Sequence, residues 1–307
     1  MGFSENMVDI LLATYNGEKY VKTQILSLIS QSYLNWNLII HDDGSTDDTV
    51  KIIKELAAQD SRIKLIEDGV SCKSAALNFM HLLRYSTSAY VMFCDQDDIW
   101  FDNKVEYMYC GIRCTDDNTP NVLYTNAYVW SSLIGILGNA TSTFPPNINS
   151  LLFLKSGIQG CASIFNAKMR DLLLKWNGPL AMHDHLLHLL GCSVGNVYYK
   201  DIPLMLYRNH DKNVTGGTRI NKNDIRSIYS AIDHPVVCKK HYDAVVMFRE
   251  QYADVLGDDK KRIIDAYINL PNKGLLYRSF SILKNQFKCY DSTFRILIKM
   301  ILKPYIK

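Results

Sequence analysis

YVMFCDQDDIW, residues Tyr90 to Trp100, begins as a short apolar run and ends in three carboxylates, Asp95, Asp97 and Asp98. The apolar run predicts a buried parallel strand. Carboxylates packed this closely repel one another, and a cation or ordered hydrogen-bond donors would offset that cost. Because open α/β sheets bind ligands just beyond the carboxyl ends of their strands, the stretch predicts either a ligand site or a solvated acidic turn.

The residues before this stretch alternate between strand and helix patterns. Apolar runs typical of strands occupy residues 8–12, 37–41 and 63–66. Three helices are expected between the strands: one with an apolar stripe of Val21, Ile25, Leu28 and Ile29, one capped by Ser45 or Thr46, and one at about 75–85. Such alternation predicts an α/β fold in which helices flank a mostly parallel central sheet.

Composition and charge narrow the class of protein. The 307 residues are 48% hydrophobic and 21% charged, which is ordinary for a chain that can bury a sizeable core. A net charge of +3 argues against a dedicated nucleic-acid-binding protein. No run of 18 apolar residues predicts a membrane span. The eight cysteines form no CxxC pair, which favours a reducing, cytoplasmic location.

Polar motifs follow the first, second and fourth candidate strands. They are Thr14-Tyr15-Asn16, Asp42-Asp43-Gly44-Ser45 and Asp95-Gln96-Asp97. No GxGxxG motif follows the first strand, which argues against a dinucleotide-binding Rossmann domain. Carboxylates at strand ends instead suit a site that grips ribose hydroxyls and a metal ion.

These motifs, taken together, resemble a known family. Residues 11–50, LLATYNGEKYVKTQILSLISQSYLNWNLIIHDDGSTDDTV, are similar to the amino-terminal signature of family-2 glycosyltransferases of the GT-A fold. Those enzymes add a DxD motif at the end of a fourth strand. The form DQDDIW at residues 95–100 resembles bacterial rhamnosyl- and glucosyltransferases that build surface polysaccharides. The resemblance implies an inverting, metal-dependent glycosyltransferase whose donor is dTDP-rhamnose or a UDP-hexose.

The resemblance also implies roles for individual residues. Ala13 and Tyr15 would flank the nucleotide base, and Asp43 would hold the base or its ribose. Asp95 would accept hydrogen bonds from the ribose hydroxyls. Asp97 would bind the divalent cation, Mn²⁺ or Mg²⁺, that bridges the diphosphate.

Other residues near these motifs receive weaker or structural assignments. Lys73 falls in a loop where related enzymes present a basic or polar residue to the nucleotide. Trp100 is expected to wall the donor pocket, and Asp98 to support the turn. Turn and capping chemistry is the favoured interpretation of Asp42 and Asp47.

A short motif at residues 182–185, MHDH, supplies the candidate catalytic base. In the family an HD or ED pair opens a helix at the active site, and Asp184 matches its acid. A carboxylate within hydrogen-bond reach can take the proton of an attacking hydroxyl. The alternatives are an N-cap role for Asp184 and a zinc site built from His183, His185 and His188. The histidine spacing disfavours zinc, because the three would not share one helical face.

The second half of the chain is expected to complete the site. Strands are predicted at residues 121–128, 157–165 and 197–200, and a long loop at 131–149. Residues 203–210, PLMLYRNH, resemble the family's P-L-x-x-Y-R-x-H, whose histidine ligates the metal beside the DxD aspartate. The resemblance implies His210 as the second protein ligand of the Mn²⁺ or Mg²⁺, followed by a glycine hinge at 216–217.

The carboxyl-terminal part is typical of helices with uneven charge. We expect a catalytic domain at residues 1–220 and a helical region at 221–307. Residues 273–307 hold eight Lys/Arg and one Asp among large apolar side chains. This pattern suits either a helix lying on an anionic membrane or a helix packed on the domain with its lysines outward.

The predicted reaction moves a sugar from a nucleoside-diphosphate sugar to a hydroxyl of a saccharide acceptor, lipid-linked as in many relatives, in polysaccharide biosynthesis. The expected location is the cytoplasm, with peripheral contact at the inner face of the cell membrane and no nucleic-acid partner. Two alternatives stay open. One is a catalytically inactive sugar-nucleotide-binding or scaffold protein. The other is a sugar-nucleotide pyrophosphorylase, although TYNGEKY lacks that class's Gly-rich basic loop.

Overall fold

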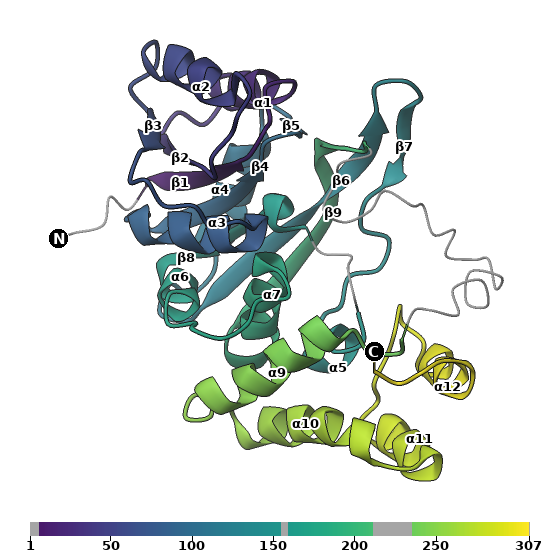
Figure 1. The fold of residues 1–307 in the computed structure, drawn as a ribbon. Helices are drawn as coiled ribbons and strands as arrows, with labels where there is room; N and C mark the ends of the chain where they lie inside the picture. The colour runs from purple at the N-terminus through teal and green to yellow at the C-terminus, as the bar shows by residue number, and fades with distance from the viewer. Residues whose placement is uncertain (1–5, 155–158, 211–234, 307) are drawn as a thin grey trace.

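One nine-stranded sheet organises the chain, as the computed structural model shows for residues 6–154, 159–210 and 235–306. The strand order is β3-β2-β1-β4-β8-β6-β9-β5, and β7 pairs with β6 beside this path (Figure 1). The strands are β1 Val8–Thr14, β2 Trp36–Asp42, β3 Ile63–Ile66, β4 Tyr90–Asp95, β5 Ile99–Trp100, β6 Asn121–Ser131, β7 Gly135–Asn139, β8 Ser163–Asn166 and β9 Asn196–Arg208.

Helices cover both faces of this sheet. The α-helices are α1 Val21–Ile29, α2 Thr49–Ala57, α3 Ala75–Leu82, α4 Lys104–Arg113, α5 Ile148–Leu151, α6 Ala167–Leu173, α7 His183–Val194, α9 Lys239–Gln251, α10 Asp258–Asn269, α11 Leu275–Lys284 and α12 Thr293–Leu302, and the 3₁₀ turns are η1 Leu83–Tyr85, η2 Gly160–Ala162 and η3 Leu270–Asn272.

Side-chain alternation along the strands builds two hydrophobic cores. On β4, Met92 joins a core with α1, α2 and α4, whereas Val91 and Phe93 join a second core with α3, α6 and α7. Successive residues of a strand point to opposite faces, so a continuous apolar run can feed both cores. The buried run at Tyr90–Asp95 therefore forms a central strand, as predicted.

Parallel pairing brings the polar motifs to one edge of the sheet. Strand β1 pairs in parallel with β2 and β4, and β2 pairs in parallel with β3. Ala13 lies opposite His41 on one side and Asp95 on the other. The expected α/β sheet is confirmed, and antiparallel pairing enters it where β8, β7 and β5 pair.

Some predicted boundaries are wrong. Helix α2 has Asp48 as its N-cap residue, and neither Ser45 nor Thr46 caps it, because both bond to the neighbouring loop. The long loop at 131–149 contains β7, which forms a hairpin with β6, and the start of α5. The strand expected at 157–165 is only β8, preceded by η2, and residues 157–158 lie outside the described residues.

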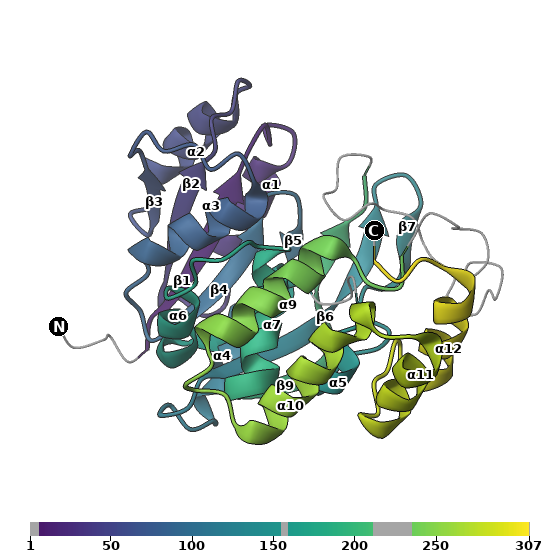
Figure 2. The same ribbon diagram turned by 60° about the horizontal axis from the view of Figure 1, so that its bottom comes forward.

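The carboxyl-terminal helices pack on the second half of the sheet. Figures 1 and 2 both place α9 beside α7, with α10, α11 and α12 continuing away from it. Val245 and Phe248 of α9 belong to the same hydrophobic core as Leu186 of α7. The Tyr252 hydroxyl donates to the Leu172 carbonyl at 2.8 Å. The predicted domain boundary at residue 220 and the glycine hinge at 216–217 lie outside the described residues.

Candidate active site

The loops after β1 and β2 interlock through side-chain to backbone hydrogen bonds. The backbone N–H of Asn16 donates to the Ser45 hydroxyl at 2.7 Å, and the Asn16 side-chain oxygen accepts from the Thr46 N–H at 2.8 Å. The Gly17 N–H donates to the Thr49 hydroxyl at 2.8 Å. Asn16 has a φ of 46°, a left-handed conformation that asparagine tolerates better than most residues. The TYNG and DDGSTD motifs therefore shape one another.

Asp42 and Asp47 serve these turns. Asp42 accepts the backbone N–H groups of Gly44 and Ser45 at 3.1 and 2.7 Å, and the Thr14 hydroxyl at 2.8 Å. Asp47 accepts the Thr49 N–H at 3.1 Å within its own turn, and the Glu18 N–H at 3.2 Å. Both carboxylates are occupied by local hydrogen bonds of the type that stabilises Asx turns, as predicted.

Gln96, the middle residue of the DxD motif, joins the ends of β1 and β4. Its side-chain oxygen accepts the Tyr15 N–H at 3.0 Å, and its side-chain nitrogen donates to the Tyr15 carbonyl at 3.0 Å. A Cβ atom added to Gly17 would lie 2.2 Å from the Gln96 oxygen. A side chain at position 17 would therefore displace the Gln96 amide from its hydrogen bonds with Tyr15. The sequence analysis assigned no role to Gln96.

Asp97 and His210 meet although 113 residues separate them in the chain. The Nε2 atom of His210 lies 2.7 Å from Oδ2 of Asp97. The His210 ring stacks on Tyr20 with a centroid distance of 5.0 Å. Asp97 and His210 are both partly exposed, with 18% and 17% of their side-chain surface accessible. One carboxylate oxygen and one imidazole nitrogen, both able to bind a metal ion, are therefore accessible to solvent at the end of β4.

Arg208 positions this pair from β9. Its Nε donates to the Asp97 carbonyl at 2.6 Å, and its backbone N–H donates to Oδ1 of Asp98 at 3.1 Å. The guanidinium also lies over the rings of Tyr20 and Trp130, 4.8 and 4.5 Å from their centroids. Arg208 contacts both the Asp97 backbone and the Asp98 carboxylate. It therefore fixes the position of β9 relative to the DQDD motif.

Burial and mutual repulsion raise the pKa values of Asp95 and Asp98 in this cluster. The carboxylates of Asp95 and Asp98 and the thiol of Cys161 lie within 4.8 Å of one another. Burial, followed by the negative charge of Asp97, raises the pKa of Asp95 to about 7. Burial and the charge of Asp95 raise the pKa of Asp98 well above its usual range. Asp98 is 1% exposed and supports the turn by accepting from Arg208, as expected.

A buried cation, Lys104, lies beneath these acids. Its side chain is fully buried; Nζ donates to the Cys161 carbonyl and lies 2.9 Å from the Met205 sulfur. Burial lowers the pKa of Lys104 to about 8, while Cys161, Cys94, Asp98 and Asp95 act to raise it. This ammonium is the counter-charge that closely packed carboxylates need. Helical spacing places Lys104 one turn before the apolar Met108, which indicates a buried position but not the pairing with the acids.

The expectation that Trp100 walls the donor pocket is wrong. Only 2% of Trp100 is exposed, and its ring lies 3.7 Å from the Lys104 ammonium. Such a cation over an indole face is an attractive contact. Trp100 therefore stabilises the buried cation and belongs to the core.

Asp184 lies at the start of α7, close to the DxD acids. The helix begins at His183 with Met182 as its N-cap residue, so Asp184 is not the cap. Its carboxylate accepts backbone N–H groups of His185 and Gly160, and its charge raises the pKa of Asp95. Burial raises the pKa of Asp184 to about 6 despite those hydrogen bonds. A carboxylate that titrates near neutrality suits proton transfer.

The three histidines around Asp184 point to different neighbours. His183 packs between Phe79 and Phe93, with ring centroids 4.1 and 4.8 Å away, and burial lowers its pKa to about 3. A Cβ atom on Gly160 would lie 2.4 Å from the His183 ring nitrogen Nε2. His185 contacts His241, and His188 lies 2.9 Å from the Pro145 carbonyl. Neutral His183 therefore supports the backbone around Asp184.

The residues assigned to the nucleotide base line the outer part of this edge. Tyr15 is 56% exposed just beyond β1, and Ala13 is partly buried beside Asp95. Asp43 is buried, and it accepts the backbone N–H groups of Lys73 and Ser74 at 3.1 and 3.2 Å. The Lys73 side chain is exposed. Asp43 thus holds the loop that presents Lys73.

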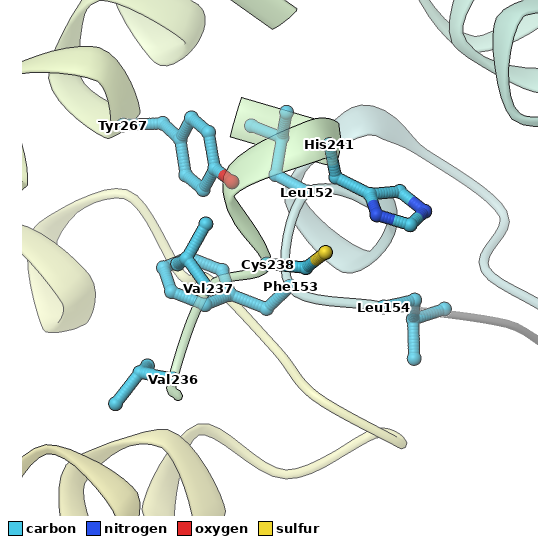
Figure 3. A pocket seen from close by; sticks show the side chains of 8 residues that line it. All are labelled: Leu152, Phe153, Leu154, Val236, Val237, Cys238, His241 and Tyr267. Carbon is cyan, nitrogen blue, oxygen red and sulfur yellow. The ribbon is translucent and has the colours of Figure 1, made fainter. Parts of the chain in front are cut away.

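A pocket beside the carboxyl-terminal helices does not suit a nucleotide sugar. Figure 3 shows its lining: residues 152–154 and 236–238, His241 and Tyr267. Its empty volume is about 180 Å³. This volume includes open solvent, and the lining is mostly apolar, so the pocket offers few groups that could bind a diphosphate. The candidate active site at the strand ends shares no residue with this pocket.

Comparison with known proteins agrees with this arrangement. The family model described as "Glycosyl transferase family 2" matches residues 9–130. The chain is 28% identical over 222 residues to the dTDP-rhamnosyl transferase RfbG of Shigella flexneri, covering 67% of this chain and 73% of that protein. It is 39% identical over 100 residues to the Escherichia coli UDP-Glc:alpha-D-GlcNAc-diphosphoundecaprenol beta-1,3-glucosyltransferase WfgD. That match covers 33% of this chain and 38% of WfgD.

Solved structures share the fold at low sequence identity. S. aureus TarS in complex with UDP-GlcNAc superimposes with a TM-score of 0.57 at 15% identity, over 91% of this chain and 80% of that one. The mannosyltransferase PcManGT of Pyrobaculum calidifontis, in complex with GDP-Man and Mn²⁺, gives 0.52 at 15% identity, over 90% and 73%. These likenesses show a common GT-A fold.

Proposed function

We propose, for a chain that carries a glycosyltransferase family 2 domain at residues 9–130, that it transfers a hexose or deoxyhexose with inversion onto a saccharide hydroxyl. The donor would be dTDP-rhamnose or a UDP-hexose, the classes named for RfbG and WfgD. The observation that carries the proposal is the 2.7 Å approach of His210 to Asp97, within the cluster that also holds Asp95 and Asp184. Retention of these groups together disfavours an inactive scaffold protein.

Asp97 and His210 would hold a divalent cation. A carboxylate oxygen and an imidazole nitrogen this close, both accessible to solvent, fit Mn²⁺ or Mg²⁺ when diphosphate oxygens and water complete the shell. When bound, the cation would neutralise charge on the departing nucleoside diphosphate as a Lewis acid. The Arg208 side chain donates to the Asp97 backbone carbonyl and keeps Asp97 in place. Asp97 and His210 are therefore already positioned to bind a metal ion.

Asp184 would accept the proton of the acceptor hydroxyl. Its pKa of about 6 leaves it ionised at neutral pH yet basic enough to bind a proton as the hydroxyl attacks. Its helix start is held by the backbone of Gly160, which limits where the carboxylate can lie. Asp184 would act from the acceptor side, opposite the diphosphate, which leads to inversion at the anomeric carbon.

Asp95 and the loop residues would bind the nucleoside. Asp95 would accept hydrogen bonds from the ribose hydroxyls, while Ala13 and Tyr15 would flank the base. Asp43 would contact the base or ribose through Oδ2, which accepts the Ser74 N–H and keeps a second lone pair, because Oδ1 already accepts from Ser71, Cys72 and Lys73. Lys73 would reach the nucleotide from its exposed loop.

The acceptor would be lipid-linked, and α11 would contact the membrane that carries it. WfgD's name includes a diphosphoundecaprenol acceptor. On α11, Leu276, Phe280 and Leu283 are 88%, 63% and 57% exposed and recur at the spacing of one helical face. The surrounding segment 273–307 has eight Lys/Arg and one Asp, which suits an anionic bilayer surface. None of the described helices has the length and hydropathy to span a bilayer.

A thermal-shift screen of nucleotide sugars, with and without Mn²⁺, tests the proposal. A donor that binds the folded state raises the melting temperature by mass action. We expect one dTDP- or UDP-sugar to do so only with Mn²⁺, and the same sugar to be hydrolysed slowly without acceptor. Failure of every nucleotide sugar to stabilise the protein or to be consumed would refute the assignment.

A further inference from the structure

A second group of metal-binding side chains lies at the outer end of β2, separate from the DxD cluster. It comprises His41 at the end of β2, Asp68 after β3, and His81 on α3. His41 Nε2 lies 3.3 Å from Oδ1 of Asp68, and His81 Nε2 lies 2.6 Å from Oδ2 of the same carboxylate. One ligand atom from each residue lies within 4.8 Å of the others.

The hydrogen bonds of Asn78 define which nitrogen of His41 carries the proton. Asn78 donates from its side-chain nitrogen to the His41 carbonyl at 3.2 Å, so its side-chain oxygen is left as an acceptor. That oxygen lies 2.7 Å from His41 Nδ1, which must therefore be the N–H donor. In the neutral ring, Nε2 then directs a lone pair at Asp68.

This arrangement leaves an electron-rich centre that a proton or a metal ion would stabilise. Hydrogen bonds from the Tyr85 hydroxyl and the Val70 N–H, at 2.6 and 3.0 Å, lower the pKa of Asp68 and keep it ionised. A lone pair facing a carboxylate is unfavourable unless a proton or a metal ion lies between them. Ligand histidines characteristically donate their other ring N–H to a protein oxygen, as His41 does to Asn78.

We propose that His41, Asp68 and His81 bind a Zn²⁺ ion. Two imidazoles and one carboxylate match the three-ligand set that zinc accepts, with water at a fourth position. Tetrahedral bonds of about 2.0–2.1 Å place ligand atoms roughly 3.3 Å apart, the spacing of His41 and Asp68 here. His81 would exchange its hydrogen bond to Asp68 for the metal. The side chains of Asp68 and His81 are 22% and 13% accessible, so the ion can enter from solvent.

The ion would join three elements that support the donor side of the active site. His41 immediately precedes the Asp42-Asp43 motif, and Asp68 precedes the loop whose amides bind Asp43. His81 comes from the helix that follows that loop. Zinc at this position would therefore hold the loop against β2. It is distinct in chemistry from the Asp97–His210 pair, because imidazole-rich sites favour zinc over Mn²⁺ or Mg²⁺.

The test uses the full chain after removal of metals with a chelator. Zn²⁺ binding is measured by calorimetry, and Co²⁺, a spectroscopic substitute, by its visible absorption. We expect one Zn²⁺ per chain, a higher melting temperature, and a Co²⁺ spectrum that Zn²⁺ abolishes. Asp97→Asn, the matched control, should keep all three signals even though it alters the candidate active site. His81→Gln should lose them, and Asn78→Ser should weaken Zn²⁺ affinity about 10- to 100-fold.

Several results would overturn the proposal. They are no Zn²⁺ binding by the wild type, equal binding by His81→Gln, or loss of binding in Asp97→Asn alone, which would place the ion at the DxD motif. If His81→Gln does not fold, Asp68→Asn replaces it, because the amide oxygen still accepts the Tyr85 and Val70 hydrogen bonds. These readouts do not depend on transferase activity, so failure of the proposed function leaves them interpretable.

Discussion

The side-chain amide of Gln96 forms two hydrogen bonds with the backbone of Tyr15, accepting its N–H and donating to its carbonyl, each at 3.0 Å. The amide thereby extends the pairing of β1 with β4 by one residue, beyond Ala13 and Asp95. The residue usually written as x in DxD thus links the DxD motif to the TYN motif.

Gln96→Ala should weaken donor binding. Each lost hydrogen bond contributes about 1 kcal/mol, and the loop at Tyr15, which we propose flanks the base, would lose its link to the end of β4. We expect the donor KM to rise roughly tenfold with little change in kcat, measured by steady-state kinetics. Gln59→Ala, at an exposed glutamine whose side chain donates to the Glu55 carbonyl, is the control. A wild-type KM in Gln96→Ala would contradict the linking role.

Asp97→Ala and His210→Gln should each abolish Mn²⁺-dependent stabilisation by the nucleotide sugar. A ligand at 100 times its Kd stabilises the folded state by about 2.7 kcal/mol, so the loss is easily measured by thermal shift. Asp258→Asn changes a fully exposed carboxylate on α10 and should behave as wild type. Retained Mn²⁺ dependence in both active-site variants would show that the ion binds elsewhere.

Asp184→Asn should remove transfer while preserving donor binding. Loss of a general base typically costs 10²- to 10⁴-fold in rate, about 3–5 kcal/mol of activation free energy. In the wild type, kcat should rise with pH through about 6, because the base must be ionised to accept a proton. Transfer assays and donor titrations on the same preparation separate the two effects. Full activity in the variant would exclude Asp184 as the base.

The same substitution should stabilise the protein at neutral pH. The folded-state pKa of Asp184, about 6, lies above its ordinary value of 3.8, so the folded state retains the proton more strongly. Ionisation therefore costs stability as pH rises from about 4 to 6, and the cost is complete above that range. Asp184→Asn should gain about 1–3 kcal/mol in urea unfolding at pH 8 and almost nothing at pH 4. A gain independent of pH would point to a different cause.

Leu276→Glu combined with Phe280→Glu should reduce membrane binding. Burying each side chain in a bilayer interface contributes about 1.5–3 kcal/mol, so the pair should lower partitioning into anionic vesicles by at least tenfold. Co-sedimentation with vesicles measures this. Leu133→Glu, which alters a residue 93% exposed between β6 and β7, is the matched control. Equal loss in the control, or no wild-type binding, would argue that α11 faces water or protein instead.

Local patterns predict the amino-terminal half well for a physical reason. Strands β1, β2 and β4 are buried on both faces, so each is a continuous apolar run bounded by polar turns. Parallel pairing then requires their carboxyl ends to share one edge. The approximate positions of Asp43 and Asp95 follow from that rule alone.

The second half was predicted less accurately because its pairing depends on distant partners. Strand β7 is short, half exposed and rich in glycine, and it exists through its hairpin with β6. Lys104 and Arg208 carry no local signal of their roles. Only the folded chain places an ammonium under Asp95 and a guanidinium against the Asp97 carbonyl.

The sequence by itself determined the class of fold, the family and the side chains available for chemistry, because buried strands and strand-end motifs are local features. The tertiary structure decided which of those side chains act together. It joined Asp97 to His210 across 113 residues, raised the pKa of Asp184 by burial, and brought His41, Asp68 and His81 to one point. Distances and desolvation arise only when remote segments pack, and no local pattern specifies them.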